Sequence, residues 1–284
     1  MKKTNLKFQQ ETNYEYKSLH IEKDEQRELA WYYLEGNPRP CFTPSLLENI
    51  LEWYDDVKNK PENKDIKYIV AASKSKGAFN LGGDLDLFIQ LIEKQDRHNL
   101  LRYATACIDV LYHTYSSLGG RVTTISLVQG DALGGGFEGA LSSDVLIAER
   151  SAKMGMPEIL FNLFPGMGAY SLLSRKIGAA QAEKMILSGK LYSAQELFEM
   201  GLVDILAEDG EGKEAVYEYI NRENRAPNGF RALRKAKLCC NPVTYEELEK
   251  ITNVWVDAAL QLSAKDVRMM GRLVKRQSAK SSVS

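Results

Sequence analysis

The chain has 284 residues, of which 44% are hydrophobic and 26% are charged, with 37 Lys and Arg against 38 Asp and Glu. This length is enough to bury one large core or two smaller ones, and a net charge of −1 argues against a protein that coats nucleic acid or anionic membrane. No window has the roughly 20 apolar residues of a membrane span, and the N-terminus leads into no apolar signal core. We therefore expect a cytoplasmic protein.

Cysteine and histidine are scarce. The four cysteines are too few and too scattered for a disulfide scaffold or a zinc site, and only three histidines occur. The adjacent Cys239 and Cys240 are expected near a helix end as reduced thiols. We expect no metal, and we expect acid–base chemistry to use some of the 38 carboxylates.

The first predicted elements are a strand pair and a helix. Residues 14–21 alternate in polarity and predict a strand, and the apolar residues 29–34 predict its hairpin partner. Thr43 and Pro44 then offer an N-cap and a first-turn proline for an amphipathic helix that ends near Pro61.

Strands and helices alternate through the middle of the chain, and helices dominate after Pro165. The order indicates an α/β core that carries a helical C-terminal region. The predicted segments are a strand at 66–72, a glycine-rich turn at 77–84, a helix at 85–117, a strand at 122–128, a glycine-rich segment at 130–139, and strands at 145–148 and 203–206.

The segment 134–139 satisfies the G-x-G-x-x-G pattern of dinucleotide-binding proteins. Two features argue against dinucleotide binding. Glu138 would place a carboxylate inside the anion site of such a motif, and four residues separate the predicted strand from the first glycine. An oxyanion hole is a second use of these glycines, because they let backbone N–H groups approach one oxygen atom. Tight packing of a helix on a strand is a third use, and this segment alone does not decide between the last two.

Glu158 is the only charged residue in the apolar stretch from Met154 to Gly166. Burial there would disfavour the charged carboxylate and raise its pKa towards the range that suits proton transfer. A solvent-facing glutamate in the first turn after Pro157, held by the helix dipole, is an equally good interpretation from composition.

Taken together, these segments resemble the crotonase superfamily, the enoyl-CoA hydratase/isomerase fold, over about residues 66–206. The resemblance implies a crotonase-like ββα spiral core over residues 1–206 with the N-terminal strand pair, and a helical region at 207–284 for oligomerisation and covering the acyl pocket. The matching motifs are GAFNLGGDL at 77–85, QGDALGGGFE at 129–138, MPE at 156–158, PGMGA at 165–169, SGKLYSAQE at 188–196 and GLVD at 201–204.

The same resemblance implies the roles of four residues. The backbone N–H groups of Gly83 and Gly135 would bind the thioester oxygen, and Glu138 and Glu158 would be the paired acid and base. Addition or removal of water across C2–C3 of a thioester places enolate-like charge on that oxygen, which two fixed donors stabilise. Two carboxylates in different environments can then divide the proton transfers.

Three segments resemble the sequences of the bacterial diffusible-signal-factor synthases, namely NLGGDLDLF at 80–88, EGALSSD at 138–144 and FNLFPGMGAYS at 161–171. That resemblance implies dehydration of 3-hydroxyacyl thioesters of acyl carrier protein or coenzyme A to cis-2-enoyl thioesters. It also implies hydrolysis of the thioester to release a cis-2-unsaturated fatty acid as a quorum-sensing signal. By analogy the acyl pocket is lined by Leu133, Gly134, Met167, Trp255 and Leu273, although ordinary core positions are the simpler interpretation of Trp255 and Leu273.

Several alternatives and partners remain open. A hydratase of fatty acid degradation would share the same catalytic residues, and a third hypothesis is a regulatory partner bound by the receiver domain of a sensor kinase. The resemblance also implies a homo-oligomer, a trimer or a hexamer, and no metal or redox cofactor. Residues 264–284 carry six Lys and Arg against one Asp. This basic run is either a solvated helix face or a binding site for an acidic carrier protein or for coenzyme A phosphates. Lys74 and Lys76, just before the first glycine-rich motif, could add to such a site.

Overall fold

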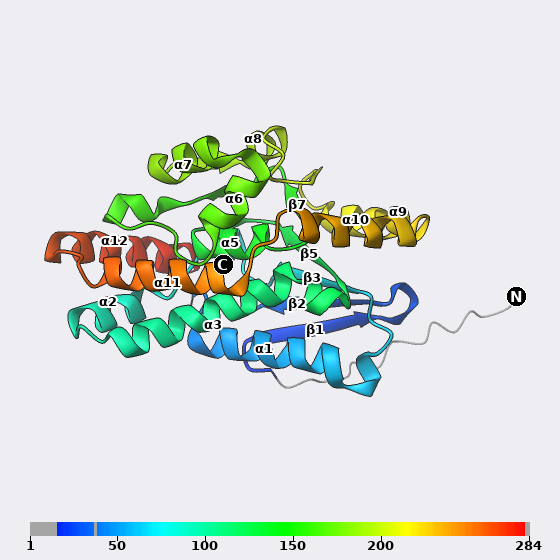
Figure 1. Ribbon diagram of the computed structural model, residues 1–284, viewed down its shortest axis with the longest axis horizontal. Coiled ribbons are helices and arrows are strands. Elements are labelled where there is room, and N and C mark those ends of the chain that lie inside the picture. The colour runs from blue at the N-terminus through cyan, green and yellow to red at the C-terminus, as the bar shows by residue number, and fades with distance from the viewer. Residues whose placement is uncertain (1–15, 37–38, 282–284) are drawn as a thin grey trace, which may run out of the picture.

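A computed structural model describes residues 16–36 and 39–281 of the chain, with side chains up to residue 274 (Figure 1). The larger of its two sheets has the strand order β1-β2-β3-β5-β7-β10. β1 and β2 pair antiparallel, and every other neighbouring pair is parallel. The strands are β1 (Leu19–Asp24), β2 (Leu29–Leu34), β3 (Tyr68–Ser73), β5 (Thr123–Val128), β7 (Val145–Glu149) and β10 (Ile205–Ala207).

Both faces of the larger sheet are buried, and the central strands β3, β5 and β7 are accordingly buried along almost their whole length. On β2, Ala30 and Tyr32 face the core shared with α1 (Pro44–Asn59) and α3 (Arg97–Tyr115). Trp31 and Tyr33 face the opposite core, which α9 (Gly212–Asn224) covers.

The smaller sheet has the order β4-β6-β8-β9, with β4, β6 and β8 parallel and β9 antiparallel to β8. Its strands are β4 (Ala78–Asn80), β6 (Asp131–Leu133), β8 (Lys153–Gly155) and β9 (Leu191–Ser193). Along the chain, β3, β5 and β7 of the larger sheet are each followed by one strand of the smaller sheet. The carboxyl ends of β4, β6 and β8 therefore meet at one edge of the smaller sheet.

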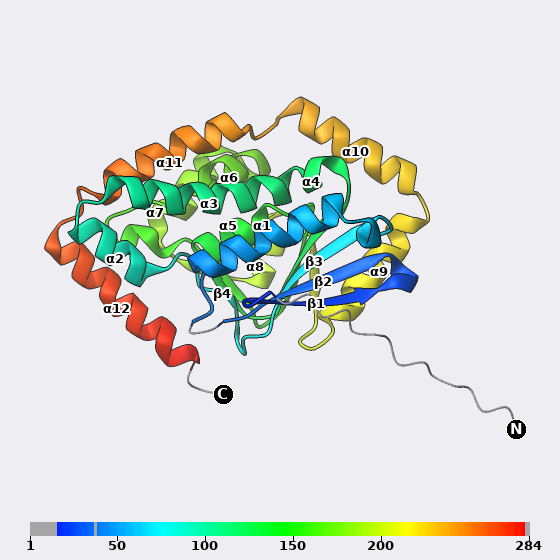
Figure 2. The same cartoon turned by 90° about the horizontal axis from the view of Figure 1, so that it is seen from below.

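The helices surround the two sheets. In Figure 2, α11 lies along α3, and α12 lies beside α2. The helices are α2 (Leu85–Glu93), α4 (Ser117–Gly120), α5 (Gly135–Leu141), α6 (Ala169–Ile177), α7 (Ala179–Ser188), α8 (Ala194–Glu199), α10 (Pro227–Cys240), α11 (Tyr245–Ala259) and α12 (Ala264–Ser281), with short 3-10 turns η1 (Glu25–Arg27), η2 (Pro61–Asn63) and η3 (Pro157–Phe161). The expected division after residue 206 falls within β10.

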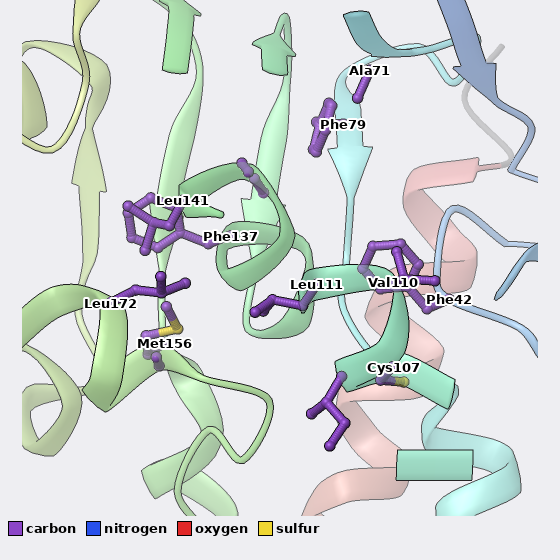
Figure 3. Close-up of a cluster of buried hydrophobic side chains, with 14 of the residues drawn as sticks. Phe42, Ala71, Phe79, Cys107, Val110, Leu111, Phe137, Leu141, Met156 and Leu172 are labelled. Carbon is purple, nitrogen blue, oxygen red and sulfur yellow. The ribbon is translucent and has the colours of Figure 1, made fainter. Parts of the chain in front are cut away.

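The short helix α5 is anchored in the core. Figure 3 shows Phe137 and Leu141 of α5 beside Leu172 of α6 and Met156, with side chains of α3 nearby. Phe137 is fully buried. Because α5 cannot rotate without displacing these side chains, the residues that point the other way, into the cavity described below, are held in place.

The structure confirms the predicted hairpin, the helix start at Thr43, whose hydroxyl accepts from the Leu46 N–H at 3.2 Å, and the strands at the centre of the larger sheet. The single predicted helix 85–117 is wrong. α2 ends at Glu93, Gln95 takes a left-handed φ of 53°, and Asp96 caps α3. The apolar periodicity continues across this break, so it gave no sign of the turn.

Other predictions need smaller corrections. None of the four strands of the smaller sheet was expected, because three residues are too few to show a period of two, and β4 lies inside the segment 77–84 that was predicted as a glycine-rich turn. The strand predicted at 203–206 lies at 205–207. The first strand, predicted at 14–21, lies at 19–24, and residues 14–15 of that prediction lie outside the described residues. Cys239 and Cys240 are free and exposed at the end of α10, as expected.

Candidate active site

One cavity of about 320 Å³ opens at the edge where β4, β6 and β8 end. This volume is in the range of small-molecule sites, ~300–1,000 Å³. All nine residues singled out from the sequence line it, namely Gly83, Leu133, Gly134, Gly135, Glu138, Glu158, Met167, Trp255 and Leu273. The roles of these residues remain predictions, but the fold brings them to one place from widely separated parts of the chain.

Gly83 and Gly135 lie against each other across two loops. A Cβ atom on Gly135 would lie 3.5 Å from the Gly83 nitrogen and 2.2 Å from Cε of Met167. A Cβ on the neighbouring Gly82, whose φ is +96°, would lie 2.8 Å from the carbonyl oxygen of Leu133. The glycines are therefore needed for this close approach, which leaves room for two N–H groups and one ligand atom.

The N–H groups of both residues are available to a ligand. Within the described residues, no backbone partner accepts from the Gly83 N–H, and Gly135 is the first residue of α5, where N–H groups have no partner in the helix. This arrangement can act as an oxyanion hole.

Glu138 is in the first turn of α5 and is 1% exposed. Its Oε1 accepts hydrogen bonds from the backbone N–H groups of Met167 at 2.9 Å and Ala169 at 2.8 Å. Burial raises the pKa of Glu138 to about 7, although the N–H groups around the start of α6 oppose this rise. These donors stabilise the anion of Glu138 in particular.

Glu158 follows β8, in the turn η3, and its side chain points to the glycines rather than to solvent. Its Oε1 lies 2.1 Å from where a Cβ on Gly134 would be, and its Oε2 is buried without a hydrogen-bond partner. Burial, and then the charge of Glu138, raise the pKa of Glu158 to about 8. The alternative of a solvent-facing glutamate is therefore wrong.

The pKa values of both glutamates are raised, but the surroundings of the two carboxyl groups differ. Glu138 has two N–H donors for its charge, whereas Glu158 has an orphaned oxygen and a negative neighbour. These surroundings favour the anion at Glu138 over the anion at Glu158, so a proton shared by the pair resides mainly on Glu158. Such an arrangement can supply one base and one acid in the same cavity.

The remainder of the cavity is apolar. Trp255 of α11 and Phe88 of α2 meet edge to face with ring centroids 5.0 Å apart, and the absence of a side chain at Gly166 makes room for the indole. Phe88 and Tyr103 are lining residues that sequence reasoning missed. Their apolar spacing on helices is typical of core positions, so no signal in the sequence distinguishes them.

The basic C-terminal run lies on α12, beside the cavity. Lys265, Arg268 and Arg272 are exposed there, while the side chains of Lys275, Arg276 and Lys280 lie outside the described part. Lys74 instead pairs with Glu22 at 3.3 Å. Among the described residues, no group of His, Cys, Asp and Glu is arranged to hold a metal ion, and no helix is long and apolar enough to cross a membrane.

Known proteins resemble this chain in sequence. It is 29% identical to the fatty acid oxidation complex subunit alpha of Pseudomonas syringae pv. tomato, over 72% of this chain but 27% of that protein. It thus spans about a quarter of that relative's length. It is also 28% identical to the mitochondrial methylglutaconyl-CoA hydratase of Rattus norvegicus, over 94% of this chain and 82% of that protein.

Solved structures share its fold. An enoyl-CoA hydratase from Bacillus halodurans superposes with a TM-score of 0.75 at 23% identity, covering 90% of this chain and 99% of that one. Pseudomonas aeruginosa DspI superposes with a TM-score of 0.67 at 23% identity, covering 81% and 92%. These likenesses confirm the predicted crotonase fold. The sequence profile described as enoyl-CoA hydratase/isomerase matches residues 39–239, and the chain belongs to that family.

Proposed function

We propose that the protein catalyses the addition or removal of water across C2–C3 of an acyl thioester. One observation carries this proposal: two buried glutamates with raised pKa values share an apolar cavity with the neighbouring Gly83 and Gly135, whose N–H groups have no backbone acceptor among the described residues. The N–H groups of Gly83 and Gly135 would hold the thioester oxygen, and each such donor is worth ~3–4 kcal/mol to the transition state.

In the hydration direction, Glu138 takes a proton from water as the oxygen atom bonds to C3. The electrons of the double bond move towards C2, and charge develops on the thioester oxygen between the two N–H groups. Glu158 then gives its proton to C2, so the elements of one water molecule are added. Dehydration reverses these steps, with Glu158 as the base and Glu138 as the acid that protonates the leaving hydroxyl.

The cavity walls favour a plain hydrocarbon acyl chain. Among the described lining residues, Glu138 and Glu158 are the only charged ones, and no Lys, Arg or His faces the cavity. The rat relative is named for a methylglutaconyl thioester, whose acyl group ends in a carboxylate. A carboxylate would be buried here without a cation, at a cost of several kcal/mol, so we propose a fatty acyl substrate.

The sequence motifs support a more specific reaction: dehydration of a 3-hydroxyacyl thioester to the cis-2-enoyl form, followed by hydrolysis to a free cis-2-unsaturated acid that acts as a diffusible signal. Hydrolysis would use the same oxyanion hole, with one glutamate activating water for attack on the thioester carbon. A hydratase of fatty acid degradation is the second candidate, and it is favoured by the same paired glutamates.

We propose three kinds of binding partner. An acidic acyl carrier protein suits the exposed Lys265, Arg268 and Arg272 on α12, the helix that also supplies Leu273 to the cavity. A homo-oligomer suits the exposed apolar side chains of Tyr170, Leu187 and Val254. The receiver domain of a sensor kinase is proposed from the family resemblance alone.

The test incubates the purified protein with 3-hydroxydodecanoyl carrier-protein thioester or trans-2-dodecenoyl-CoA and analyses the products by mass spectrometry. Free cis-2-enoic acid supports the signal synthase, and only the hydrated CoA ester supports the hydratase. Glu138→Gln and Glu158→Gln should each lower turnover by at least roughly a hundredfold while remaining folded. Near wild-type turnover in both variants would refute the assignment.

A further inference from the structure

The loop that carries Gly83 is held by a segment from elsewhere in the chain. We call residues 39–43, just before α1, the strap. The Leu81 N–H donates to the Pro40 carbonyl at 2.7 Å, the Phe42 N–H donates to the Gly82 carbonyl at 2.8 Å, and Phe42 and Gly83 form a parallel bridge. Phe42 itself is anchored in the core near Val110 and Cys107 (Figure 3). The strap therefore fixes one side of the loop.

Tyr103, on α3, joins the strap to the loop. Its hydroxyl donates to the Phe42 carbonyl and accepts from the Asp84 N–H at 3.1 Å, so it bridges the strap and the peptide group directly after Gly83. The ring is buried and stands edge-on to Phe88 at 5.2 Å. Burial raises the pKa of Tyr103 well above its usual value, so the hydroxyl keeps the proton that it donates.

Arg39 holds the other end of the loop. Its guanidinium donates to Asp84 at 3.1 Å and to Asp86, and its side chain is only 11% exposed. Asp84 also accepts from the Leu87 N–H at 3.3 Å, which fixes the start of α2. On the far side, a Cβ on Gly83 would lie 2.6 Å from the Phe88 ring, so the loop has no room to move towards α2.

We infer that Tyr103 and Arg39 are positioning residues that set the direction of the Gly83 N–H in the oxyanion hole, an inference that rests on the proposed function. The hydroxyl of Tyr103 already donates to and accepts from backbone groups, so its role is to hold the loop rather than to react. The placement of an oxyanion donor affects the rate strongly, because a misplacement of ~1 Å at a catalytic site can cost about a hundredfold.

Tyr103→Phe and Tyr54→Phe form a matched pair. Tyr54 is also buried, and its hydroxyl also has two partners, Tyr32 at 2.9 Å and Thr114 at 2.8 Å, but it does not line the catalytic cavity. We expect both variants to lower the unfolding temperature. Only Tyr103→Phe should lower kcat, by about 10- to 100-fold with little change in KM.

A second readout does not depend on turnover. The absorption band of bound 4-(dimethylamino)cinnamoyl-CoA moves to longer wavelength when hydrogen-bond donors polarise its carbonyl group. We expect a red shift with the wild type and with Tyr54→Phe, and a clearly smaller one with Tyr103→Phe. Arg39→Lys keeps the charge but loses the guanidinium that donates to both Asp84 and Asp86, so it should also reduce the red shift. This variant tests the inference if Tyr103→Phe fails to fold.

The outcomes separate this inference from the proposed function. A wild-type protein that gives no red shift and no turnover refutes the thioester site itself, and this positioning role with it. A wild-type red shift that Tyr103→Phe and Arg39→Lys both retain, with kcat unchanged, refutes only the positioning role. Equal losses of kcat in Tyr103→Phe and Tyr54→Phe would also overturn it, because the effect would then be general loss of packing.

Discussion

Glu158 should destabilise the protein at alkaline pH because its carboxylate has no hydrogen-bond partner at Oε2. Its pKa rises from 4.5 to about 8 in the folded state. The folded protein thus holds a proton that the unfolded chain has lost, so stability falls as the pH rises from about 4.5 to about 8. At about 1.36 kcal/mol per pH unit, the upper limit of this loss is ~5 kcal/mol, and we expect ~2–5 kcal/mol because the residue is partly solvated.

Glu158→Gln removes the titration while keeping nearly the same shape. The variant should therefore become more stable than the wild type at pH 8.5, and the advantage should shrink steadily towards pH 5. The measurement is urea unfolding across this pH range at a fixed protein concentration. Glu249→Gln, at an exposed position of α11, controls for loss of a charge. A stability difference between wild type and Glu158→Gln that does not vary with pH would show that this carboxyl group is not desolvated.

Three further predictions concern activity and packing. Hydration should show a bell-shaped pH profile with limbs near 7 and 8, since Glu138 must be ionised and Glu158 protonated; a flat rate from pH 6 to 9 would contradict this. Gly166→Ala would place a Cβ 2.2 Å from Trp255, so it should cost ~1–3 kcal/mol of stability and move substrate preference to shorter acyl chains in a chain-length series. Ser193→Ala breaks the capping box of α8 with Glu196 and should cost ~1 kcal/mol in thermal unfolding without changing kcat, whereas a fall in kcat would link this helix to the site.

Local sequence patterns predicted much of the larger sheet, and the family resemblance singled out Glu138 and Glu158 as candidate reacting groups. The apolar runs of β3, β5 and β7 and the Thr43–Pro44 helix start are signals that short segments carry by themselves. The smaller sheet was not predicted, because strands of three residues exist only through pairing with distant neighbours.

The sequence by itself determined that glycines and two glutamates occur in motifs typical of thioester chemistry, and that no strong charge or membrane segment competes with that interpretation. The tertiary structure decided the surroundings of these residues. It leaves Oε2 of Glu158 without a partner and gives Glu138 the N–H groups of Met167 and Ala169. It also ties the Gly83 loop to Tyr103. Desolvation and donor geometry depend on residues far apart in the chain, so only the assembled fold sets the proton affinities of the pair.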